Sequence, residues 1–356
     1  MIFLTLLSCS KHEETSIIPD KGAEIEFGKI ATKAVKDATD ITGFEVSIAA
    51  TNATTGADYV SLLTNEPVTP NSDHTEWNYP HTQYWMDGIH YYFVASYSYD
   101  LDDESRTNIG KFTKEDIGEG VDYTVFKYSL DVDTTVKDSD GNDSNENSRV
   151  DIMTAFDYVY TNDEWTMQNV GLTFSHLLTK VNFRISQDIN KDQVNNYYIT
   201  KISLSNVRSH GIYSVIPVEG TFYPSWEMTE SKSKYEKTFD NYKLTEQKTI
   251  DGETITTSTP LLAWGDDGLL LIPQDIRNGE VTIAIDYIHE YVDQSGEMED
   301  YEVERHVEAT IPAAEWESNK SITYVISIAN PNQIIFERPK VEKWASAQSG
   351  STIIIK

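Results

Sequence analysis

The side chains that most often carry catalysis are present in this chain, but their spacing does not predict an enzyme. The sequence contains no nucleophile elbow of the G-x-S-x-G type, no HExxH motif, no phosphate-binding P-loop and no glycine fingerprint for dinucleotides. The 58 acidic residues bring carboxylates near one another throughout the sequence, so no acid–base pair can be assigned from spacing alone. The eight histidines lack the spacing of metal ligands and stand at positions 12, 74, 81, 90, 176, 210, 289 and 306. We therefore expect neither an enzyme nor a bound cofactor.

Two places in the sequence raise the question of a metal ion. The segment Asp138–Asp143 has the composition of a calcium loop, but an EF-hand needs glycine at the sixth position, which is Asp143, and glutamate at the twelfth, which is Arg149. A solvated hairpin tip fits these residues better. His176 lies in an apolar stretch, where a buried and hydrogen-bonded imidazole is more frequent than a metal ligand. We predict no metal site.

An aromatic cluster offers a third kind of chemistry, which is stacking on sugar rings. Its members are Trp77, Tyr79, Tyr84 and Trp85. Exposed, coplanar aromatic side chains would indicate a surface protein that binds glycans. The same residue types also fill the cores of β-sheet proteins, and we favour that packing here. The exposure of Trp77 and Trp85 decides between the two interpretations.

The one cysteine of the chain, Cys9, follows an apolar stretch and precedes a polar one. Residues 6–9, Leu-Leu-Ser-Cys, resemble the bacterial lipobox, in which the cysteine becomes the lipidated first residue of the mature protein. A lipid attached there would hold the protein at a membrane without a spanning helix. We predict that residues 1–9 form a lipoprotein signal segment, that Cys9 is lipidated, and that residues 10–22 form a flexible tether.

Composition limits the partners of the chain. Its 356 residues include 28 basic and 58 acidic side chains, which gives a net charge of −30. Such a charge repels phosphate backbones, so we expect no nucleic-acid partner. No apolar run approaches the roughly 20 residues that a membrane-spanning helix needs. The length and the 39% of hydrophobic residues suffice for the packed cores of two domains.

The elements that would position any site are predicted to be β-strands. Apolar and polar residues alternate over Val281–Tyr291, which is the period of a strand with one buried face. Tyr91–Ala95 is a continuous apolar run, as expected of a strand buried on both faces. Glycine-containing turn signals such as Asp87-Gly88 and Asn278-Gly279 separate the strands. Many antiparallel strands joined by such turns predict an all-β protein built of antiparallel β-sandwiches.

One change of register stands out in this pattern. Leu172 and Phe174 point to one face of a strand, whereas Val181 and Phe183 have the opposite parity. We predict that all four are buried in one sandwich, in the C-terminal half, and that a β-bulge near 176–178 accommodates the extra residue.

Several motifs, taken in their order along the chain, resemble the fimbrillin family of Gram-negative anaerobes, the subunits of type V pili. Each motif is weak alone, and their order over most of the chain carries the resemblance. Besides the lipobox, they are Glu24–Gly28, Ala31–Ala34, Thr42–Val46, Tyr91–Ala95, Asp151–Ala155, Leu172–His176, Lys180–Phe183, Leu271–Gln274 and Trp316–Tyr324.

The resemblance implies a fold and a domain division. The family fold is two tandem antiparallel β-sandwich domains of transthyretin-like topology, in agreement with the strand pattern. We place the N-terminal sandwich at residues 23–165 and the C-terminal sandwich, with a terminal strand segment, at residues 166–356.

The resemblance also implies a function, as a structural subunit or accessory adhesin at the cell surface. Such a protein is exported as a lipoprotein of the outer membrane, trimmed at its N-terminus, and polymerised with other pilus subunits into a fimbria; surface ligands of host or bacterial cells are further possible partners. The family is usually cut after an arginine, but the first arginine of this chain is Arg106, and Lys33 takes the expected position. A monomeric, glycan-binding surface lipoprotein is the alternative.

Strand exchange in that family assigns roles to both ends of this chain. Ile25 and Phe27 alternate with polar residues and would fill the groove that trimming empties. Ile353 and Ile355 share one face of the apolar C-terminal segment and are the candidate donor residues. The same segment can also be read as the last strand of its own domain.

Overall fold

Every regular element that the structure describes is a β-strand or a turn. The structure is a computed structural model, and it describes residues 23–32, 41–52, 60–74, 76–101, 110–119, 124–137, 143–144, 149–162, 169–187, 195–250, 253–291, 301–330 and 333–344. Among these residues there is no α-helix, which confirms the all-β prediction. Accordingly, the described part of the chain has no helix long and apolar enough to cross a membrane.

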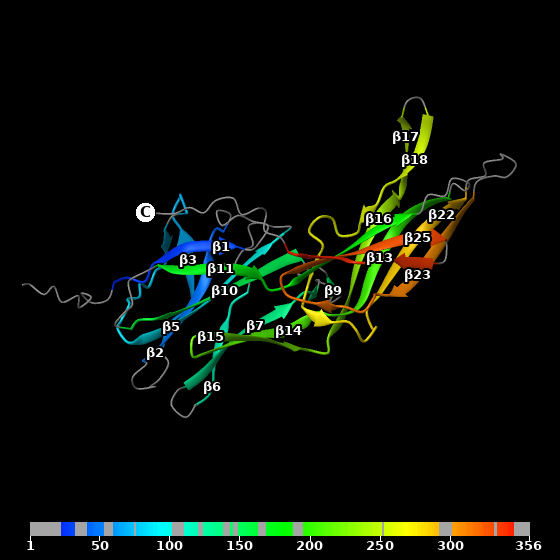
Figure 1. Cartoon of the computed structure of the whole chain (residues 1–356). Helices are drawn as coiled ribbons and strands as arrows, with labels where there is room; N and C mark the ends of the chain where they lie inside the picture. Colours follow the sequence, from blue (N-terminus) through cyan, green and yellow to red (C-terminus); the bar gives the residue numbers. More distant parts are fainter. Residues whose placement is uncertain are drawn as a thin grey trace, which may run out of the picture.

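Seven strands of the N-terminal half form one closed sheet, at the left of Figure 1. Their order around the ring is β1 (Phe27–Thr32), β11 (Val170–His176), β10 (Val150–Tyr160), β5 (Ile89–Asp100), β2 (Phe44–Asn52), β3 (Val60–Pro70) and β4 (Trp77–Asn78). The side chains that point into the ring form one hydrophobic core. The predicted interior strand is β5, which is buried on both faces because Phe93 packs into the ring and Val94 packs into a second cluster outside it.

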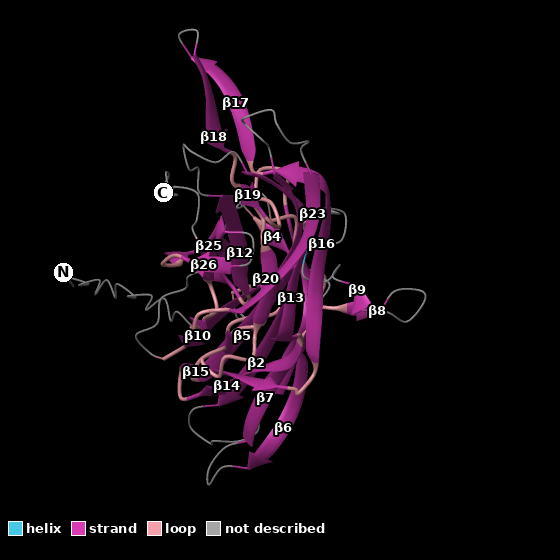
Figure 2. Cartoon of the chain, turned by 90° about the vertical axis from the view of Figure 1, so that its right-hand side faces the viewer, coloured by secondary structure: helices cyan, strands magenta, loops and turns pink. Residues whose placement is uncertain are grey.

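A second sheet draws strands from both halves of the sequence. It consists of β6 (Thr113–Glu119), β7 (Thr124–Asp133), β14 (His210–Val218) and β15 (Thr221–Met228). The pairing that joins the halves is that of β7 with β14, in register from Tyr128 opposite Val215 to Asp133 opposite His210. Figures 1 and 2 both show these strands beside β5 and β10 of the closed sheet.

The C-terminal half packs two further sheets around its own core. One sheet contains β16 (Lys232–Lys243), β13 (Asn195–Arg208), β22 (Thr282–Tyr291) and β23 (Tyr301–Thr310). The other contains β12 (Thr179–Gln187), β19 (Leu261–Leu262), β20 (Leu269–Leu271), β25 (Lys320–Asn330), β26 (Gln333–Phe336) and β27 (Lys340–Lys343). The predicted alternation is present in β22, where Ile283, Ile285 and Tyr287 are buried and the residues between them are partly exposed.

Three two-stranded pairs complete the described elements. They are β8 (Val136–Lys137) with β9 (Asp143–Ser144), β17 (Thr245–Ile250) with β18 (Glu253–Ser258), and β21 (Gln274–Asp275) with β24 (Glu315–Trp316). The β17–β18 pair extends away from the rest of the molecule at the upper right of Figure 1.

After Phe174 the buried side chains change from even to odd residue numbers, because the chain passes from one hydrophobic core to another. Our prediction that these residues share one sandwich is wrong. Leu172, Phe174, Val181 and Phe183 are all buried. The first two, however, pack inside the closed sheet, and the last two pack in the C-terminal core. At Leu177–Leu178 the chain leaves the closed sheet, and β12 then pairs with β25 instead of β10 and β1. The alternation of buried residues therefore shifts because the chain passes from one sheet to another, and not because of a bulge within one sheet.

The predicted division near residue 165 lies outside the described residues and stays a prediction. Pairings cross that position in two places, since β11 pairs with β1 and β10, and β14 pairs with β7. The two halves are therefore joined through shared sheets as well as through the chain itself.

Candidate functional site

The first described segment, residues 23–32, is bonded along both of its edges. On one edge β1 runs parallel to β11, and on the other the preceding residues pair with the segment around Tyr84. Three backbone hydrogen bonds extend this pairing beyond β1: from Ile25 N–H to the Gln83 carbonyl (2.8 Å), from Trp85 N–H to the Ala23 carbonyl (2.9 Å) and from Val170 N–H to the Glu26 carbonyl (2.8 Å). The segment thus occupies the position that closes the ring of strands.

The side chains of this segment supply a large part of the core inside the ring. Ile25 is 0% exposed and Phe27 is 2% exposed. The Phe27 ring makes edge-to-face contacts with three aromatic rings, those of Phe44 (5.8 Å between centroids), Tyr79 (5.5 Å) and Phe93 (6.2 Å). Such contacts add specific geometry to the burial of apolar area. Removing the segment would therefore leave an apolar groove.

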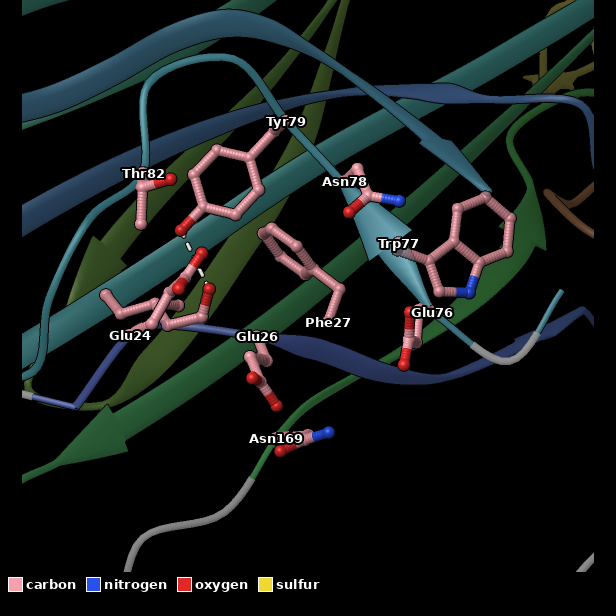
Figure 3. Close-up of a pocket in the computed structure, with 10 residues that line it drawn as sticks. Glu24, Glu26, Phe27, Glu76, Trp77, Asn78, Tyr79, Thr82 and Asn169 are labelled. Atoms are coloured by element: carbon pink, nitrogen blue, oxygen red, sulfur yellow. Dashed lines mark hydrogen bonds between the residues drawn. The ribbon is translucent and has the colours of Figure 1, made fainter. Parts of the chain in front are cut away.

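A cavity of about 350 Å³ lies beside this segment, between β1 and β4. Figure 3 shows its lining residues: Glu24, Ile25, Glu26, Phe27, Glu76, Trp77, Asn78, Tyr79, Thr82 and Asn169. The Tyr79 hydroxyl donates a hydrogen bond to the Ile25 carbonyl (2.7 Å). Burial, with smaller contributions from neighbours that include Glu24, raises the pKa of Tyr79 to about 12, so the hydroxyl keeps its proton and remains a donor.

The close approach of β1 to its neighbour depends on a glycine. A Cβ on Gly28 would lie 2.6 Å from the Cβ of Asn169, closer than packed carbon atoms allow. The register between β1 and β11 also shifts between Phe27 and Ile30. Segment 23–32 is therefore held by a short, interrupted ladder and by buried side chains.

The acidic side chains of this cavity do not form a metal-binding group. Within the described residues, no group of three or more His, Cys, Asp or Glu side chains could hold a metal ion. The three carboxylates of the lining belong to Glu24, Glu26 and Glu76, and no histidine, lysine or arginine lies among them. The arrangement can hold or release a strand through backbone pairing and apolar contact.

Comparison with known proteins identifies the family. A model of a fimbrillin-like family matches residues 32–344. The chain belongs to the fimbrillin-like family. This confirms the resemblance noted in the sequence, and the matched region begins at the last residue of β1.

A solved structure shares the fold of this fimbrillin-like chain, and a second one aligns with a lower score. A fimbrial protein from Bacteroides vulgatus aligns with a TM-score of 0.56 at 17% identity, over 90% of this chain and 100% of that one. A candidate cell adhesion protein from Bacteroides uniformis aligns over 92% of this chain and 99% of that one, at 16% identity and with a TM-score of 0.43. A search of curated protein sequences finds no match.

Three of the four residues of the aromatic cluster, Trp77, Tyr79 and Trp85, pack in or against the core of this fimbrillin-like chain. Trp77 is 6% exposed and Trp85 is 3% exposed, which confirms the core packing that we favoured. Of the four residues, Tyr84 is the exposed one, at 51%. Trp77 and Trp85 therefore cannot serve as a flat surface for sugar rings in this conformation.

The predicted environment of His176 is also confirmed. The side chain is buried, and its Nδ1 lies 2.9 Å from Oδ1 of the buried Asp151. Its ring stacks on Trp344, with 3.8 Å between centroids and 4° between planes. The imidazole thus ties β10 and β11 to the end of the described chain.

Several predicted site residues lie outside the described residues and stay predictions. They are the lipidation site Cys9, the tether 10–22, the processing site Lys33, the calcium-like residues Asp138–Asn142, and the donor candidates Ile353 and Ile355.

Sequence reasoning missed three residues of the site. Tyr79 was noted only as an aromatic residue, and Gly28 and Asn169 were not singled out. Their contacts join segments far apart in sequence, as in the hydrogen bond from Tyr79 to Ile25 across 54 positions. A weak signal was present at Gly28, because glycine within a strand often marks the close approach of another backbone.

Proposed function

We propose that this chain is a structural subunit or accessory adhesin of a cell-surface type V pilus, with a structural rather than a catalytic role. It is exported as a lipoprotein through Cys9, reaches the outer membrane, and polymerises with other pilus subunits. Membership of the fimbrillin-like family and the shared fold of a fimbrial protein support this proposal. A tandem arrangement of transthyretin-like sandwiches is part of the same proposal.

The observation that carries the proposal is the position of residues 23–32. They form the first described strand, they bury Ile25 and Phe27, and they close the ring next to a cavity. Their removal would expose apolar area worth roughly 1.5–3 kcal/mol for each of these two side chains. It would also free backbone groups on β11 and β4, and an open edge of this kind is a template for an incoming strand.

The cut and the donor strand are proposed at the two ends of the chain. Lys33 directly follows β1, so cleavage there would release the strand as a unit. The segment that ends in Ile353, Ile354 and Ile355 is the proposed donor. A groove on one subunit filled by the tail of the next is a head-to-tail contact that does not close, so it grows a filament.

The test uses surface material from cells that express the wild type or single-purpose variants. Lys33→Ala should leave full-length monomer, and Ile353→Asp with Ile355→Asp should abolish SDS-resistant ladders, because two carboxylates would enter an apolar groove. Ile354→Asp, which faces the other side of such a strand, is the matched control and should keep the ladders. Ladders that persist in the double variant would rule out this tail as the donor.

Lipidation is tested separately from assembly. Cys9→Ala should abolish the incorporation of labelled fatty acid and the retention at the membrane, with both halves still folded. Label that still enters the Cys9→Ala protein would overturn the lipoprotein assignment.

A further inference from the structure

A second cavity, of about 410 Å³, lies between the outer face of the closed sheet and the β14–β15 hairpin. Figures 1 and 2 both show β10 running beside β14 and β15. We call this cavity the junction cleft. Its lining residues come from both halves of the chain: Thr154, Ala155, Phe156, Thr173, Ser175, His176, Leu177, Tyr213, Pro224, Ser225, Trp226, Ser318 and Asn319.

Two kinds of side chain make up most of the lining of the junction cleft. Charged residues make up 24% of the chain, yet no Asp, Glu, Lys or Arg lines the cleft. One kind of lining residue is hydroxyl- or amide-bearing: Thr154, Thr173, Ser175, Ser225, Ser318 and Asn319. The other kind is aromatic, namely Phe156, Tyr213 and Trp226. A ligand that fits must present apolar faces together with uncharged hydrogen-bonding edges.

The aromatic wall is set in place by packing. Trp226 lies against Tyr213, with 5.2 Å between ring centroids, and Phe156 stacks on Phe222, also at 5.2 Å. Trp226 is only partly buried, so it borders the cleft rather than belonging to the interior. A wall fixed in this way costs little conformational entropy when a ligand binds.

Polar atoms of side chains that line the cleft have no partner among the described residues. Trp226 Nε1 and Asn319 Oδ1 are buried and have no hydrogen-bond partner in the described part of the chain. Asn319 also has a positive φ of 60°, a conformation that asparagine adopts at a small cost. Buried polar atoms without partners are uncommon in folded proteins, and these two belong to side chains that line this cleft.

We propose that the junction cleft binds a neutral saccharide. A pyranose ring has apolar C–H faces that pack on aromatic rings and hydroxyl edges that exchange hydrogen bonds with Ser, Thr and Asn. A lipid chain would leave the hydroxyls of the lining unpaired. An anionic ligand would meet no Lys or Arg side chain there, and the one histidine of the lining, His176, already pairs with the carboxylate of Asp151. The inference rests on the adhesin part of the proposed function and names its ligand class.

The experiment measures binding by the purified full-length monomer, with saturation-transfer NMR. The probes are four neutral saccharides, lactose, N-acetyllactosamine, mannobiose and cellobiose, with N-acetylneuraminic acid as the charged comparison.

Trp226→Ala removes the aromatic wall and should weaken binding at least tenfold. Thr173→Trp fills the cleft from an exposed position of β11 and should abolish binding without disturbing the fold. Tyr223→Ala removes an aromatic side chain of the same hairpin that is 57% exposed and does not line the cleft, and it should bind like the wild type.

The outcomes separate this inference from the proposal on assembly. Saturation by at least one neutral saccharide, lost in Thr173→Trp and kept in Tyr223→Ala, supports the cleft. The inference is overturned if none of the four neutral probes is saturated, if only the charged sugar binds, or if Thr173→Trp binds unchanged. Sugar binding is measured on the monomer, so its result does not depend on assembly. Absence of SDS-resistant ladders would contradict the proposed assembly and not the cleft, and intact ladders would not support the cleft if no sugar binds.

Discussion

Strands β1 and β12 make similar contributions to their cores but are held in their sheets differently. Both run parallel to a neighbour, and both bury aromatic side chains, Phe27 in β1 and Phe183 in β12. β12 pairs with β25 over eight consecutive residues and with β19 and β20 on its other edge. β1 pairs with β11 at Phe27 and again from Ile30 to Thr32, and it meets β4 only at Phe27.

This difference indicates which strand can leave. β12 has a continuous ladder with β25 on one edge, and two short strands, β19 and β20, pair with its other edge. Many hydrogen bonds must therefore break together, so we expect β12 to open only when the C-terminal core unfolds. β1 has a short ladder with a register shift, and its stability depends on a few large side chains. We therefore expect β1 to detach at a lower free energy than β12.

The largest expected effect is that of Phe183→Ala. Phe183 is fully buried, between Trp264 (5.8 Å between centroids) and Tyr324 (5.3 Å). Removing its ring should lower the free energy of unfolding by about 3–5 kcal/mol. Urea denaturation followed by far-UV circular dichroism measures the loss. Arg184→Ala, at an exposed position of the same strand, is the control and should stay within about 0.5 kcal/mol of the wild type.

Phe27→Ala should have a smaller effect, although Phe27 is almost as deeply buried as Phe183. Detachment of β1 limits the loss, because the remaining structure need not unfold with it. We expect the decrease in global stability to be about 1 kcal/mol or more below that of Phe183→Ala. Hydrogen exchange should show the amides of β1 opening at lower free energy than those of β12. Equal losses, with β1 and β12 exchanging together, would contradict the comparison.

Asp151→Ala tests the hydrogen bond between Asp151 and His176, at the end of β11 where the chain leaves the closed sheet. The substitution removes the acceptor of the buried His176 and should cost about 1–3 kcal/mol. Asp151→Asn keeps an acceptor oxygen, so it should cost less. The order wild type, Asn variant, Ala variant in the urea midpoint is the expected result, and an Asn variant no better than Ala would argue against the hydrogen bond.

The last expected effect depends on pH and concerns the C-terminal half alone. Burial, and then the nearby Arg305, lower the pKa of His289 from 6.5 to about 4. The unfolded chain therefore binds the proton first, so the stabilisation is complete above pH 6.5 and is lost as the pH falls toward 4, with a slope of up to about 1.4 kcal/mol per pH unit. His289→Gln should remove this component, and the difference between the two stability curves measures it. Identical slopes for both proteins would contradict it.

Local patterns predicted much of the fold, because burial of alternate residues is a local property. The alternation over residues 281–291 predicted β22, and the same reasoning predicted the burial of Ile25 and Phe27. The pairing of β7 with β14 was not predictable, because the backbone groups that pair are the same at every residue and the partners lie far apart in the sequence. For the same reason the parity change after Phe174 predicted a change of face but not a change of core. At the site, the hydrogen bond from Tyr79 to Ile25 forms only once the ring of strands closes.

The shared sheet of β6, β7, β14 and β15 has a mechanical consequence. A pull that tends to separate the closed sheet from the C-terminal core is resisted by six registered pairs between Tyr128–Asp133 and His210–Val215, besides the chain itself. Tension along these strands loads their hydrogen bonds together, as in shear, whereas a single linker would carry the load through one backbone. In the filament that we propose, the two halves of each subunit would behave as one load-bearing link, and the proposed exchanged strand would be the joint between links.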